Sequence, residues 1–177
     1  GVAYNVGGSN SVTLSIADMM GALEGVFAYS VFPHSASITQ TSLSSNTVQH
    51  IMSLTNPYTQ NGRINMRQGI LRDISVAVQC NDPVEFRLYI DAPLATGIYD
   101  FQSQDGFLLG VATNTGTMNT SNSWPMISQI VGTTGSAIQF MLSDYQLVIP
   151  AGATITLACY STATIQKATV GMVWTNA

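Results

Sequence analysis

Hydrophobic and polar residues alternate with a period of two through much of the second half of this chain. Such alternation puts successive side chains on opposite faces of the backbone and predicts half-buried β-strands. Turn-forming residues separate the runs, as in Asn81-Asp82-Pro83 and Pro150-Ala151-Gly152. No helical pattern of the length needed for a parallel crossover lies between them, so antiparallel pairing is expected. The clearest runs are 74–80, 85–91, 107–112, 138–142, 155–160 and 168–174.

The first half of the chain is less regular. Residues 1–10 combine glycine and asparagine with few apolar anchors, which predicts a flexible or partner-bound arm. Residues 12–16 alternate as a strand would and lead into one short helix that ends at Gly25. A further strand is expected at 26–32, and 35–56 is rich in Ser, Thr and Gln with scattered apolar anchors. Within that last segment, the apolar positions at 48–54 fit a short helix and a strand equally well.

These elements together predict an all-β fold. The expected architecture is an antiparallel β-sandwich, jelly-roll-like, with at most one or two short helices. A length of 177 residues fits a single domain, so residues 11–177 are expected to form the sandwich and 1–10 its N-terminal arm. Thr-rich strands without charge can bond to neighbours without repelling them, so subunit assembly is expected to cover the strand edges.

Charged residues are unusually scarce in this sequence. They make up 8% of the chain, against about 25% in a typical soluble domain, while 46% of residues are hydrophobic. High hydrophobicity with low charge argues against a disordered protein. Five Lys and Arg residues and a net charge of −4 cannot supply a basic stripe, so no nucleic acid partner is expected. The sequence also lacks a run of about 18 apolar residues, so no membrane insertion is expected.

Catalytic chemistry finds little support in the sequence. Neither His34 nor His50 stands at ligand spacing from another His or Cys, and each is interpreted as a surface or interface imidazole. The carboxylates at Asp100 and Asp105 miss the spacing of a calcium loop, because Asp105 occupies the place of its required glycine. Sequence motifs for common nucleophiles and phosphate-binding loops are absent. We therefore expect no enzyme, with no catalytic residue, no metal site and no cofactor.

Two cysteines and one tryptophan are candidates for the core. Cys80 and Cys159 each end an alternating apolar run, which favours small buried thiols, and a disulfide between the sheets is the alternative. Trp174 belongs to the alternating run at 168–174 and is expected in the core.

Four other residues are candidate partner contacts. Arg63, Arg67 and Arg72 hold three of the five positive charges within ten residues, which predicts either a docking patch for an acidic neighbour or a solvated face. Trp124 stands among Asn and Ser residues, a mixture suited to a sugar ring or a protein neighbour. The alternative for Trp124 is packing at the rim of the sandwich.

Residues 140–157 combine a strand, the turn Pro150-Ala151-Gly152 and a Thr-rich strand. This stretch, FMLSDYQLVIPAGATITL, covers about a tenth of the chain and resembles bacteriophage virion β-sandwich proteins of the head-decoration, capsid or tail-surface class. The resemblance implies a non-enzymatic virion protein that contacts copies of itself and other virion proteins symmetrically. The alternative is a secreted or cell-surface carbohydrate-binding or adhesion module, which would be extracellular and hold a glycan receptor.

Overall fold

The computed structural model describes residues 2–5, 11–14, 33–102, 109–133, 135, 137–142 and 147–176. Within these residues the regular secondary structure consists of β-strands alone, which confirms the all-β prediction. The short helix expected before Gly25 and the strand expected at 26–32 lie outside the described residues.

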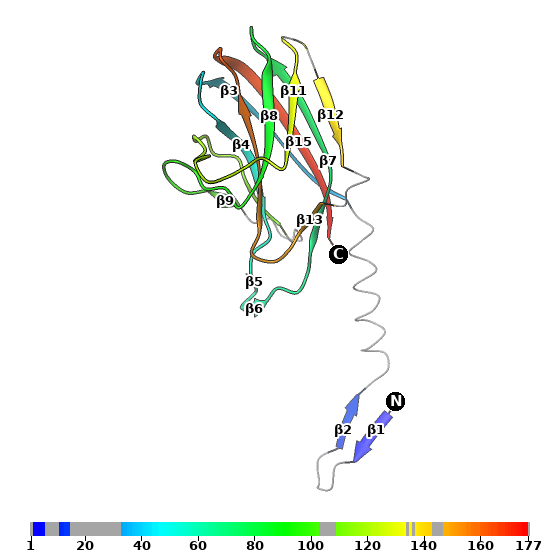
Figure 1. Cartoon of the computed structure of the whole chain (residues 1–177). Coiled ribbons are helices and arrows are strands. Elements are labelled where there is room, and N and C mark those ends of the chain that lie inside the picture. Colours follow the sequence, from blue (N-terminus) through cyan, green and yellow to red (C-terminus); the bar gives the residue numbers. More distant parts are fainter. Residues whose placement is uncertain are drawn as a thin grey trace.

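Two antiparallel sheets form the sandwich (Figure 1). The first, here called the β8 sheet, has the strand order β11-β8-β14-β4-β10-β9. Its strands are β4 (Gln49–Thr55), β8 (Val84–Ile90), β9 (Phe101–Gln102), β10 (Gly110–Ala112), β11 (Ile127–Val131) and β14 (Thr154–Tyr160). The second, the β7 sheet, has the order β12-β7-β15-β3, with β13 also paired to β7. Its strands are β3 (His34–Leu43), β7 (Gly69–Gln79), β12 (Ala137–Met141), β13 (Leu147–Ile149) and β15 (Ile165–Asn176).

The pairing of the sandwich strands is nested. The first strand, β3, pairs with the last, β15, and the second strand, β4, pairs with β14, the strand before the last. Further inward, β7 pairs with β12 and β13, and β8 pairs with β11. A long hairpin of nested pairs, wound into two facing sheets, is a jelly roll. The predicted architecture is therefore the observed one.

Two short hairpins complete the strand assignment. β1 (Val2–Asn5) pairs with β2 (Ser11–Leu14), and β5 (Thr59–Gln60) pairs with β6 (Arg63–Ile64), all antiparallel. The boundary expected after residue 10, between arm and sandwich, falls directly before β2.

The six clearest alternating runs all correspond to strands in the structure. They fall on β7, β8, β10, β12, β14 and β15, although the first part of the run at 107–112 is outside the described residues. The unassigned segment at 35–56 contains two strands, β3 and β4. The ambiguity at 48–54 has a physical cause, because β4 contains a bulge: Met52 and His50 pair with the successive residues Leu157 and Ala158. The extra residue shifts the alternation by one position.

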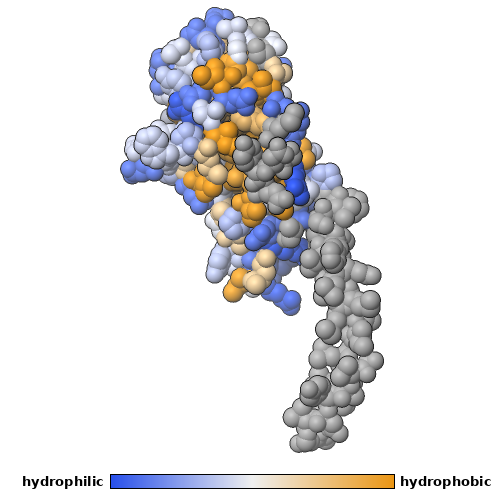
Figure 2. All heavy atoms as spheres, turned by 45° about the vertical axis from the view of Figure 1, so that its right-hand side comes forward, coloured by the Kyte–Doolittle hydropathy of each residue, from blue (hydrophilic) through white to orange (hydrophobic). Residues whose placement is uncertain are grey.

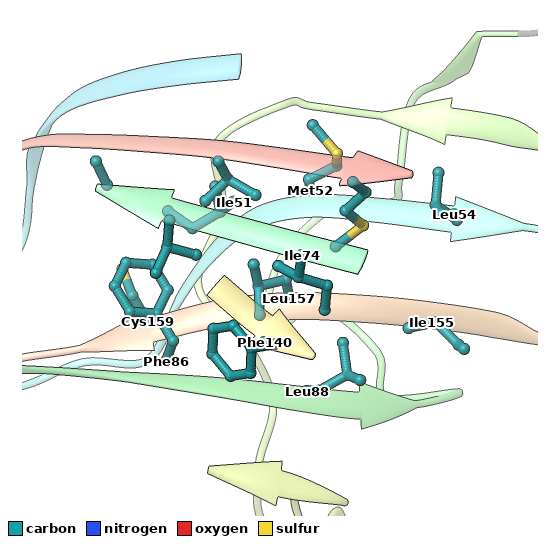
Figure 3. Close-up of a cluster of buried hydrophobic side chains, with 14 of the residues drawn as sticks. Ile51, Met52, Leu54, Ile74, Phe86, Leu88, Phe140, Ile155, Leu157 and Cys159 are labelled. Atoms are coloured by element: carbon teal, nitrogen blue, oxygen red, sulfur yellow. The ribbon is translucent and has the colours of Figure 1, made fainter. Parts of the chain in front are cut away.

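Side chains from both sheets meet between the two layers (Figure 3). Ile74 and Phe140 come from the β7 sheet and contact a layer from the β8 sheet that includes Phe86, Leu88 and Leu157. All five are at most 3% exposed. At the free-energy scale of about 1.5–3 kcal/mol per fully buried large apolar side chain, this layer is the main source of stability.

The expectations for the cysteines and Trp174 are confirmed. Cys80 and Cys159 are both buried, and neither forms a disulfide. Burial raises the pKa of the Cys159 thiol to about 12, with a smaller contribution from nearby Cys80, so this thiol stays protonated at neutral pH. Trp174 is 0% exposed and lies in the same core cluster.

Candidate interaction surfaces

Part of the outer side of the β8 sheet, around β4, is covered by the chain itself. The connection between β8 and β11, residues 91–126, carries β9 and β10 and packs its apolar residues Leu94 and Met118 onto that side. Val48, Tyr89 and Ala158 lie beneath them in a second hydrophobic cluster. As a result β4 is buried on both of its faces, and only Thr55 at its end is partly exposed.

A polar network lies under this cover. Ser53 Oγ lies 2.9 Å from Nε2 of His50 and 2.7 Å from Oγ1 of Thr156, and Nδ1 of His50 lies 2.5 Å from the carbonyl oxygen of Asn114. Because a carbonyl can only accept, Nδ1 carries the proton of the neutral ring, and Nε2 accepts from the Ser53 hydroxyl. Burial lowers the pKa of His50, although its bond to Asn114 opposes the shift.

This Ser–His pair has the hydrogen-bond order of an activated nucleophile. Both side chains are 0% exposed, however, so no substrate reaches the Ser53 hydroxyl in this conformation. The network instead joins β4, β14 and the covering connection. The interpretation of His50 as a surface or interface imidazole is therefore wrong, because the bulge in β4 and the cover together bury the ring. His34 is half-buried, and its Nε2 lies 3.1 Å from the amide of Asn176.

The outer side of the β7 sheet has a different character. Its outward side chains are exposed or half-buried, and most are Ser, Thr, Ala or Gly. We call this surface the hydroxyl face; its outward residues are Ser35, Ser37, Thr39, Thr41, Asp73, Ser75, Ala77, Gln79, Ala137, Gln139, Lys167, Thr169, Gly171 and Val173. Two shallow hollows of about 440 and 270 Å³ lie on it.

The hydroxyl face was not anticipated from the sequence. Its one visible signal is the period-two series Ser35, Ser37, Thr39 and Thr41 along β3. Hydrogen bonds between outward side chains link neighbouring strands: Thr39 Oγ1 lies 2.9 Å from Thr169 Oγ1, and Gln139 donates to Asp73. A surface of short, mutually bonded side chains is flat and loses little side-chain entropy when it is covered.

The three arginines occupy different settings. Arg63 on β6 and Arg67 in the β6–β7 connection are exposed. The Arg67 backbone is fixed by the side chain of Asn65, which accepts from its N–H at 3.0 Å. Arg72 on β7 is half-buried, and its Nε donates to Thr175 Oγ1 at 3.0 Å. Docking of an acidic partner at these arginines stays a prediction.

Trp124 projects from the connection between β10 and β11. Its side chain is 87% exposed, so the alternative of packing at the rim is wrong. Met126 and Ile130 nearby in the chain are 46% and 70% exposed. A groove of about 640 Å³ lies between β11 and β12, lined by Met126, Ile127, Gln129, Gln139, Phe140, Leu142 and Leu147. Figure 2, turned toward this side of the sandwich, shows hydrophobic side chains gathered in patches between polar ones.

No group of three or more His, Cys, Asp or Glu side chains in the part of the chain that the structure describes could hold a metal ion. Nor does that part contain a helix long and apolar enough to cross a membrane.

Neither the models of known protein families nor the curated proteins compared with this chain match it.

Proposed function

We propose that this protein is a non-enzymatic structural subunit of a virion, which builds or decorates a capsid or tail surface through symmetric contacts. Its partners would be copies of itself and other virion proteins. The observation that carries the proposal is the hydroxyl face, a broad sheet surface with few charges and short hydroxyl-bearing side chains. Such a surface is easily desolvated and leaves few charges unpaired when a neighbour covers it.

Two further features support a structural role. The jelly roll is an architecture found in viral capsid proteins, although a fold by itself does not define a function. The histidine best placed for acid–base chemistry, His50, is held in the buried network that fixes the covering connection. This burial supports a stabilising role for the Ser–His pair.

The second candidate function is a carbohydrate-binding or adhesion module. It is favoured by Trp124, because an aromatic ring exposed on a loop is a common platform for a sugar ring. Asn119 and Ser121 in the same connection supply amide and hydroxyl groups, and Asn119 Oδ1 accepts from the Ser121 N–H at 3.2 Å.

Native mass spectrometry across a concentration series, run beside a glycan array, separates the two candidates. A structural subunit forms a defined symmetric oligomer or joins purified particles and shows no glycan dependence. An 18.8 kDa monomer at every concentration, together with glycan binding that Trp124→Ala removes, would overturn the structural proposal.

A further inference from the structure

The outward side chains of the hydroxyl face lie in four rows across the strands. The end rows contain Lys167 and Asp73, whereas the two middle rows contain small or uncharged side chains. From one end to the other, the rows are Thr41-Lys167-Gln79, Thr39-Thr169-Ala77-Ala137, Ser37-Gly171-Ser75-Gln139 and Ser35-Val173-Asp73. The face therefore has opposite charges at its two ends and an uncharged centre.

The charges at the two ends of the hydroxyl face would complement those of a second copy placed in the opposite direction. At one end of the face, Arg72 lies beyond Asp73. The hydrogen bond from Arg72 to Thr175 holds the Arg72 side chain at that end. At the other end of the face, Asp82 in the turn after β7 lies beyond Lys167. A half-turn about an axis across the strands exchanges the two ends. Lys167 of one copy then lies over Val173 of the other, one strand (about 4.8 Å) from Asp73, and Arg72 lies at the same end as Asp82.

The same half-turn also matches the shapes of the two middle rows. The larger hollow on the face lies over Gly171 and is lined by Ser37, Ser75 and Thr169, among others. A Cβ at position 171 would lie 2.8 Å from Ser75 Oγ, so glycine keeps this hollow open. Thr169 stands one row away on the same strand. The half-turn places Thr169 of each copy over Gly171 of the other.

We propose that the hydroxyl face binds the hydroxyl face of a second copy of this chain, as a two-fold pair with Lys167 one strand from Asp73. This inference rests on the proposed function, because it names the surface and partner of the assembly. Four strands about 4.8 Å apart and seven residues at about 3.4 Å each give a contact of about 450 Å² per copy. Stable interfaces bury about 800 Å² per partner, so this pair is weak alone and becomes persistent when other contacts in an assembly hold it.

Charge reversal with rescue tests the inference. Lys167→Asp and Asp73→Lys are made singly and together in the full chain, and the dissociation constant is measured by sedimentation equilibrium at low salt. Each single reversal puts like charges together at both ends of the pair, so the dissociation constant rises about tenfold. The double reversal restores opposite charges and returns the constant close to the wild-type value. Circular dichroism and thermal unfolding check that each variant is folded.

A second pair of variants tests the same surface without Asp73. Thr169→Arg blocks the hollow over Gly171 and abolishes the pair, whereas Ile130→Arg, on the outer side of the β8 sheet, leaves it unchanged. An oligomer that survives Thr169→Arg, or single reversals that the double reversal does not rescue, overturns the inference and leaves the proposed function standing. A chain that stays monomeric at every concentration overturns the inference, and glycan binding by that monomer overturns the proposed function too.

Discussion

Removal of the Ser53 hydroxyl is the sharpest test of the buried network. In Ser53→Ala, Nε2 of His50 loses its donor, and Thr156 Oγ1 loses the partner at 2.7 Å. A buried polar group left without a partner costs about 1–3 kcal/mol. Thr156 still has the Tyr99 hydroxyl at 3.3 Å, which reduces its share of the cost. We therefore expect the free energy of unfolding to fall by about 2–3 kcal/mol.

The matched control is the exposed hydroxyl pair on the other sheet. Thr39→Val removes the 2.9 Å bond to Thr169 at an exposed position, and we expect a change of less than about 0.5 kcal/mol. Both variants are compared with wild type by urea unfolding at low micromolar concentration, where a weak pair does not form. At about 2–4 °C per kcal/mol, Ser53→Ala should lower the melting temperature by about 4–12 °C.

A double variant checks the reasoning independently. Adding Thr156→Val to Ser53→Ala removes a hydroxyl that has already lost its Ser53 partner, so the two losses should be less than additive. If Ser53→Ala destabilises no more than Thr39→Val, the hydrogen bonds under the cover do not hold it in place.

Three further predictions concern His50, Cys159 and the two tryptophans. The pKa of His50 is lowered in the folded state, so as the pH falls below the unfolded value of 6.5 only the unfolded chain takes up this proton. The urea concentration at the unfolding midpoint should therefore fall between pH 7.5 and pH 5.5. A midpoint that rises over this range would refute the assignment. Cys159, with its pKa raised to about 12, should resist iodoacetamide in native protein and react after unfolding, as read by intact mass. Acrylamide should quench Trp124 emission strongly, and Trp124→Phe should leave the blue-shifted, weakly quenched emission of Trp174.

Much of the sandwich could be predicted from alternation alone. Strands such as β7 and β15 have one face in the core, so their sequences record burial with a period of two. β4 was ambiguous because both of its faces are buried and a bulge shifts its phase. β3 was missed because its partly buried positions include Ala36 and His34, which give a weak hydrophobic signal.

The candidate surfaces were less accessible to sequence analysis. Trp124 could be singled out, but its exposure depends on how the long β8–β11 connection packs. The hydroxyl face needs four strands that are far apart in the sequence, and its rows exist only once the pairing register is known. The burial of His50 likewise depends on a connection that begins some forty residues later.

The position of β4 also sets how the protein should open in solution. This strand lies between β14 and β10 and beneath the covering connection, with the β7 sheet on its other side. Its amide hydrogens should exchange with solvent only through global unfolding, on the slowest timescale of the molecule. The described amides of the covering connection outside β9 and β10 belong to no strand and should exchange through local opening that leaves the two sheets together. Hydrogen exchange would thus distinguish an outer layer that opens locally from a sandwich whose amides exchange only through global unfolding.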